Sequence, residues 1–114
     1  MTYLEFSQMV GSVPLGEGFV PYAYYQFTQD TAKEPPFICY YFTEDNDFGE
    51  DNINYKAIRT AVSELYTDNK DFALEAAVEN LLTANEMRFS KTETYIDSEK
   101  MHMTVFTMEV IING

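Results

Sequence analysis

The chain has 114 residues, enough for one domain with a buried core, and 46 % of them are hydrophobic, which excludes a wholly disordered chain. Seven basic residues stand against nineteen acidic ones, and the formal net charge of −12 opposes tight binding to nucleic-acid phosphates or to an anionic membrane surface. The single cysteine, Cys39, excludes an internal disulfide and any zinc site built from several cysteines.

The first element expected is a helix over residues 3–12. Thr2 and Glu5 have the spacing of a capping box, in which each side chain bonds the backbone N–H of the other residue. Apolar residues follow at helical intervals, and Gly11 and Pro14 are suited to end the element.

Two strands are expected next, over residues 19–29 and 36–44, because both stretches are rich in aromatic and β-branched residues. A polar break over residues 30–35 separates them, and Pro21 suits an edge position. The simplest pairing is an antiparallel hairpin with a long loop. A third strand is expected over residues 54–67, where neither face is fully apolar, a pattern compatible with burial of one face only on assembly.

A second helix is expected after a polar turn, with Asp71 as its N-cap. Its apolar residues recur at i, i+3, i+4, i+7 and i+8 and form one stripe: Leu74, Ala77, Val78, Leu81 and Leu82. Three glutamates, Glu75, Glu79 and Glu86, are placed off this stripe. The stripe therefore predicts a helix that packs against the core.

Residues 88–112 are expected to form two more strands that turn at Asp97 and Ser98. The last strand is apolar on both faces, which is typical of a central strand or of one whose outer face meets a partner. The order α-β-β-β-α-β-β predicts a single α+β domain over residues 1–114. We expect a mostly antiparallel sheet of about five strands with two helices packed on one face.

The sequence gives little sign of catalysis or of a bound cofactor. His102 is the only histidine, and it has no partner at the spacing of a catalytic or metal-ligating pair. An EF-hand match over residues 45–56 fails because glycine comes at the fifth position and Lys56 at the twelfth, although a looser calcium site stays open. No stretch approaches the roughly 20 apolar residues of a membrane span. We expect a soluble protein made inside the cell, without cofactor, metal or enzymatic activity.

The order of several short words along the chain resembles one family of viral proteins. These words are MTYLEF, PPFICYYF, NDFGEDN, ELYTDNKD and ETYIDSEKM. The chain resembles the small neck and tail-completion proteins, related to tail terminators, of long-tailed phages and prophages of Gram-positive bacteria. The resemblance implies a virion protein that forms a ring, commonly a hexamer, on the last ring of the tail tube. Such a ring stops tube polymerisation, docks to the head connector and lets DNA pass through its lumen without specific binding.

Two sets of residues are candidates for the interfaces of such a ring. The most acidic segment is expected to face the lumen, a neighbouring subunit or the tube protein, through Glu44, Asp45, Asp47, Glu50 and Asp51. An interface between subunits is expected on one face of the last strand, either that of Met101, Met103 and Val105 or the opposite one, together with Arg59 and Glu64 of the third strand.

Two other readings of the chain stay open at this point. The small size and the charge also fit an acidic phage-encoded inhibitor that mimics DNA, although mimics spread carboxylates along one surface whereas these are concentrated in loops and turns. Within the phage virion, the residues do not distinguish a tail terminator from a head-side adaptor or stopper.

Overall fold

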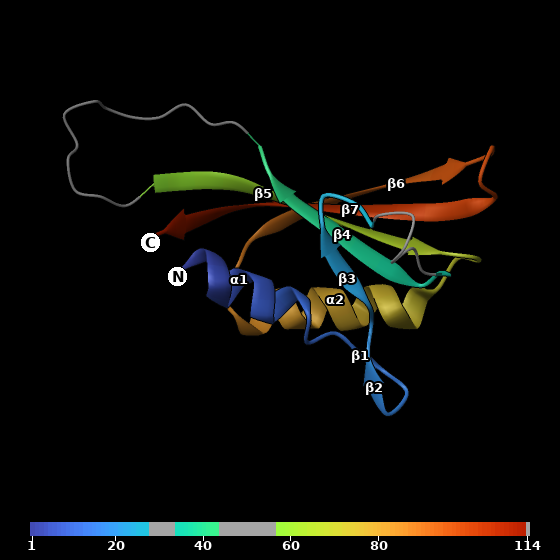
Figure 1. The fold of residues 1–114 in the computed structure, drawn as a ribbon, viewed down its shortest axis with the longest axis horizontal. Coiled ribbons are helices and arrows are strands. Elements are labelled where there is room, and N and C mark those ends of the chain that lie inside the picture. The colour runs from blue at the N-terminus through green and yellow to red at the C-terminus, as the bar shows by residue number, and fades with distance from the viewer. Residues whose placement is uncertain (28–33, 44–56, 114) are drawn as a thin grey trace.

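The computed structural model describes residues 1–27, 34–43 and 57–113 (Figure 1). Its main sheet has five strands in the spatial order β3-β4-β5-β7-β6. The strands are β3 (Tyr22–Tyr24), β4 (Phe37–Phe42), β5 (Ala57–Thr67), β6 (Phe89–Ile96) and β7 (Met101–Ile112). The helices are α1 (Tyr3–Val10) and α2 (Phe72–Ala84), and a short hairpin is formed by β1 (Pro14–Leu15) and β2 (Gly18–Phe19).

Both helices lie on the same side of the main sheet, and the β1–β2 hairpin extends beyond them (Figure 1). Three of the four strand pairings in this sheet are antiparallel. The predicted α+β class, with two helices on one face of a mostly antiparallel sheet, is therefore confirmed. Of the two alternatives for the last strand, the interior position is confirmed, because β7 pairs with β5 on one side and with β6 on the other.

The expected hairpin between the first two long strands is wrong. Strand β3 has only three residues and pairs with β4 in parallel, with Tyr22 opposite Ile38. Tyr25, at φ 71°, has a left-handed backbone that ends the strand before it can run into a hairpin turn. The connection over residues 25–36 has the dozen or so residues that return a chain for a parallel pairing.

Local capping signals place both helices at their expected starts. The Thr2 hydroxyl accepts a hydrogen bond from the Glu5 N–H, and a Glu5 carboxylate oxygen accepts one from the Thr2 N–H. Helix α1 then ends at Val10, two residues before the expected end, and the Gly11 N–H caps it by donating to backbone carbonyls of the last turn. A side chain at position 11 would collide with Tyr22, because its Cβ would lie 2.5 Å from that ring.

The hydrophobic core fills the space between the helices and the sheet. From the helices it receives Phe6, Val10, Leu74, Val78 and Leu82, and from the sheet Ile38, Leu65, Phe106 and Met108. The apolar stripe predicted for α2 faces this core, with Ala77 and Leu81 partly buried at its border. One face of the sheet thus packs against both helices and forms the core.

Candidate functional site

The side of the sheet that faces away from the helices carries half-buried apolar side chains. On β7, Phe106, Met108 and Val110 point to the helices and are buried, whereas Met103 and Val105 point the other way and are only partly buried. In the part of the chain that the structure describes, no helix lies over this second side (Figure 1). We call it the open face.

Strand alternation and register define the members of the open face. They include Phe37, Cys39 and Tyr41 of β4; Ile58, Thr60, Val62, Glu64 and Tyr66 of β5; Met101, Met103, Val105, Thr107, Glu109 and Ile111 of β7; and Ser90, Thr92, Thr94 and Ile96 of β6. At one end, Ile58 and Ile111 lie opposite each other and are 51 % and 54 % exposed. Exposed and half-buried apolar groups on one sheet face are typical of an interaction surface.

Glu64 is the charged group at the centre of the open face. Its carboxylate accepts a hydrogen bond from the Tyr66 hydroxyl at 2.7 Å and one from the Tyr41 hydroxyl at 3.2 Å. Tyr41 lies on the strand beside β5, and Tyr66 is two residues along β5 on the same face. The register between β4 and β5 thus brings Tyr41 to Glu64, 23 residues away in the sequence, while Tyr66 is only two residues from Glu64.

Aromatic rings hold the two tyrosines in place. Phe37 stacks on Tyr66 with 4.8 Å between ring centroids, and Phe27 meets Phe37 edge-on at 5.4 Å. Tyr25 packs against Tyr41 at 5.3 Å between centroids. Each such pair contributes roughly 0.5–1.5 kcal/mol beyond its buried area, so the Glu64 cluster is built on a rigid aromatic support.

The surroundings of Glu64 shift the acidity of its neighbours. Burial, the hydrogen bond to Glu64 and the charge of that carboxylate raise the pKa of the Tyr66 phenol well above its ordinary value. Burial and the Glu64 charge also raise the pKa of Tyr41. Burial and the same charge raise the pKa of the Cys39 thiol to about 11. Both phenols therefore remain protonated donors to Glu64, and the thiol remains unreactive at neutral pH.

A groove of about 450 Å³ lies beside this cluster. Its walls come from the aromatic residues Phe37 and Tyr66, from the Cys39 thiol on β4 opposite Glu64, and from Met101 at the start of β7. Glu99 contributes the carboxylate of the lining, Glu64 lies beside the groove next to Tyr66, and no basic residue of the described chain lines the groove. The groove is thus aromatic and apolar, with negative charge at its lining and beside it.

The predicted interface residues are divided between the two sides of the sheet. Met101, Met103, Val105 and Glu64 share the open face. Arg59 points to the helix side, where its guanidinium donates to the Tyr3 hydroxyl at 2.7 Å and to the Thr43 carbonyl at 2.9 Å. The other five, Glu44, Asp45, Asp47, Glu50 and Asp51, lie outside the described residues.

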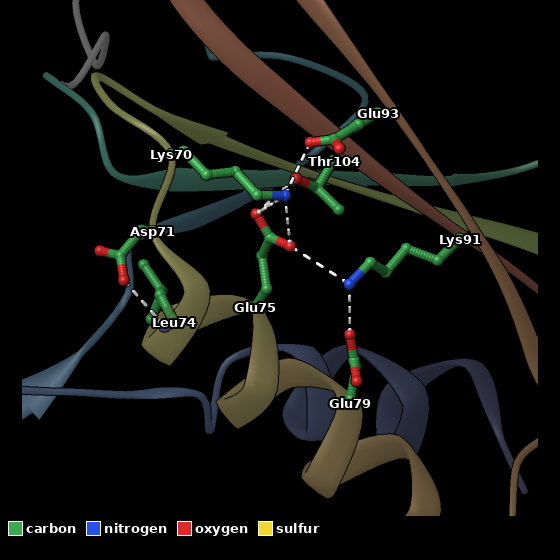
Figure 2. A network of polar contacts seen from close by, with 8 residues as sticks. All are labelled: Lys70, Asp71, Leu74, Glu75, Glu79, Lys91, Glu93 and Thr104. Carbon is green, nitrogen blue, oxygen red and sulfur yellow. Dashed lines mark hydrogen bonds and ion pairs between the residues drawn. The ribbon is translucent and has the colours of Figure 1, made fainter.

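A network of charged side chains joins α2 to the sheet on the helix side (Figure 2). Glu75, which is 2 % exposed, lies 2.9 Å from Lys70 and 3.2 Å from Lys91. Thr104 of β7 donates to the same carboxylate at 3.3 Å. Lys70 also contacts Glu93, and Lys91 also contacts Glu79.

The expectation that Glu75 lies off the core-facing stripe of α2 is wrong, because its side chain is buried like those of Leu74, Val78 and Leu82. Burial opposes ionisation of this carboxyl, but the hydrogen bonds and charges of Lys70 and Lys91 outweigh it and hold the pKa below its ordinary value. Two lysines that converge from a turn and from a strand on one glutamate leave no spacing signal in the sequence. The network is a structural tie between α2 and β6.

No described group of side chains has the arrangement of a metal site or of a catalytic triad. His102 packs edge-on against Tyr95, with 5.0 Å between ring centroids, on the helix side of the sheet. Residues 1–27, 34–43 and 57–113 contain no cluster of three or more histidine, cysteine, aspartate or glutamate side chains that could hold a metal ion. None of the described helices has the length and apolarity to span a membrane. The open face and its groove combine half-buried apolar side chains with a hydrogen-bonded carboxylate, and they are the candidate functional site.

Comparison of the chain with protein-family models, with curated proteins and with solved structures finds no significant match.

Proposed function

We propose that the protein is a structural subunit of a ring at the head-proximal end of a phage tail, where it terminates the tail tube and joins it to the head connector. The ordered words of the sequence support this family, and the open face supports an assembling role. A ring subunit needs a surface for its neighbours that is separate from the surface that folds the domain. The open face has this character, because it carries apolar side chains on the side away from both helices.

The single observation that carries the proposal is the two-sided character of β7. Its helix side is buried within the domain, while Met103 and Val105 on the open face are only partly covered. Burying apolar surface contributes about 25 cal/mol per Å² removed from water, so these side chains favour association. In the proposed ring they lie against a neighbouring subunit or against the tail tube protein.

Light scattering and electron microscopy of the purified protein, alone and with the phage's tail tube protein, test this role. We expect rings with the wild type and their loss with Met103→Lys, which places a charge on the open face. The matched control is Leu4→Lys, because Leu4 is 66 % exposed on the helix side and its replacement adds the same charge. Circular dichroism establishes that both variants are folded.

Particles made without the protein provide the test in the phage itself. Unjoined heads beside overlong tails are the expected result, because a missing terminator leaves tube polymerisation unchecked. Tails of normal length in such particles would reject termination and favour a head-side adaptor. A wild-type protein that stays monomeric with the tube protein, or a Met103→Lys variant that assembles normally, would reject the open face as the assembly surface.

A further inference from the structure

The groove beside Glu64 combines three features that suit one kind of side chain. Its volume of about 450 Å³ lies within the range of sites that accept small ligands or single large side chains. Its walls include the stacked rings of Phe37 and Tyr66. Flat aromatic faces attract cations, and arginine in particular, whose planar guanidinium stacks on them.

The Glu64 carboxylate beside the groove is the third feature. An ionised carboxylate has about four acceptor positions, and the hydroxyls of Tyr41 and Tyr66 occupy one on each oxygen. One position on each oxygen remains, which is the arrangement that a guanidinium fork binds with two parallel hydrogen bonds. Within the described chain Glu64 forms no ion pair, and its partners are two uncharged phenols that donate hydrogen bonds to it.

The charge of the chain favours an arginine from a basic partner. Each copy carries a formal charge of −12, and this field attracts a basic segment of another protein. Lys70 and Lys91 are already held in the helix-side network, and Arg59 is held by Tyr3 and Thr43.

We propose that the open-face groove and the Glu64 carboxylate beside it bind an arginine side chain from a basic segment of a different protein, with the guanidinium on Glu64 and the aliphatic stem in the groove against Tyr66 and Phe37. This site deepens the proposed function and rests on it only for the partner's place in the virion neck. The binding site itself belongs to the isolated domain. Its chemistry therefore can be tested without assembling a ring.

The probe is a synthetic peptide, acetyl-Gly-Leu-Arg-Leu-Gly-amide, titrated into the isotope-labelled full chain and followed by nuclear magnetic resonance. Its twin carries citrulline in place of arginine, which keeps the shape of the side chain and removes the charge. We expect saturable shifts of the amides of Cys39, Tyr66 and Met101 with the arginine peptide. The citrulline peptide should bind at least tenfold more weakly, because it lacks the charge that Glu64 and the rings recognise.

Glu64→Gln should weaken binding of the arginine peptide at least fivefold. The matched control is Glu109→Gln, which removes the same charge from an exposed position on the same face and should change the affinity less than twofold. Tyr66→Phe keeps the ring and removes one phenol donor, so it should retain part of the affinity.

Equal affinity of the two peptides, or equal effects of the two glutamine variants, would overturn the site. So would shifts that spread over the whole domain without saturating. Peptide binding by a protein that never forms rings would reject the ring and keep the site. Rings that form from a chain that ignores the arginine peptide would reject the site and keep the ring.

Discussion

Replacing Glu75 by glutamine tests whether the helix-side network stabilises the fold. The substitution keeps the shape of the side chain and removes its charge. Removing one partner of a buried ion pair costs about 3–5 kcal/mol when the other charge is left buried and alone. The Glu75 side chain is 3 % exposed, but its lysine partners are 26 % and 35 % exposed and retain Glu93 and Glu79. We therefore expect a loss of about 2 kcal/mol in the free energy of unfolding at pH 7.

The same reasoning predicts how the loss depends on pH. Because the pKa of Glu75 is lowered in the folded state, its contribution is full above the ordinary value of 4.5 and disappears as the pH falls through the folded-state pKa. The difference between wild type and Glu75→Gln should thus be largest at pH 6–7 and shrink below about pH 4. Urea unfolding, followed by circular dichroism at a series of pH values, measures it.

Glu79→Gln is the matched control for this experiment. Glu79 is on the same helix and contacts Lys91, but its side chain is 34 % exposed, so its replacement should cost less than about 1 kcal/mol. The reasoning is refuted if the two variants lose equal stability at pH 7. It is equally refuted if the loss in Glu75→Gln stays constant as the carboxyl of the wild type becomes protonated.

Three further predictions follow from single side chains. Phe106→Ala should lose about 3–5 kcal/mol in urea unfolding because the ring is fully buried, and a loss below 1 kcal/mol would contradict its place in the core. Asp71→Ala should lose about 1 kcal/mol, because its carboxylate caps α2 at the Leu74 N–H; an unchanged midpoint would exclude this cap. At pH 8, iodoacetamide should alkylate Cys39 at least tenfold more slowly in the native than in the urea-unfolded protein, because the pKa of the buried thiol is raised to about 11. Mass spectrometry measures both rates, and equal rates would contradict the burial of this thiol.

The sequence predicts those parts of the fold that depend on neighbouring residues. The capping box of Thr2 and Glu5 and the cap at Asp71 both appear as expected, because each needs only residues three apart. The expected antiparallel pairing of β3 with β4 is wrong, because the orientation of two strands depends on the path of the segment that connects them. Parallel and antiparallel pairings of two strands use the same residues, so strand propensity alone does not distinguish them.

The candidate site was predicted in part for a similar reason. Alternation along one strand groups Met101, Met103 and Val105 without any knowledge of neighbouring strands. The meeting of Tyr41 with Glu64 depends on the register between β4 and β5, which a single sequence does not reveal. Sequence patterns thus grouped the side chains of each face but left open which face forms an interface, whereas the groove and the carboxylate beside it emerge only from the assembled sheet.

The pairing of β5 with β7 also determines when the domain can be completed during synthesis. These two strands form the longest ladder of the sheet, from Ala57 opposite Ile112 to Thr67 opposite His102. All of α2 and β6 lie between them in the chain, so a ribosome must release both elements before β5 meets its partner. Until Ile112 has been synthesised, β5 has an unpaired edge that can bind other chains. Once β7 has left the ribosome, early formation of α2 and of the β6–β7 hairpin brings β7 closer to β5 and so speeds their pairing.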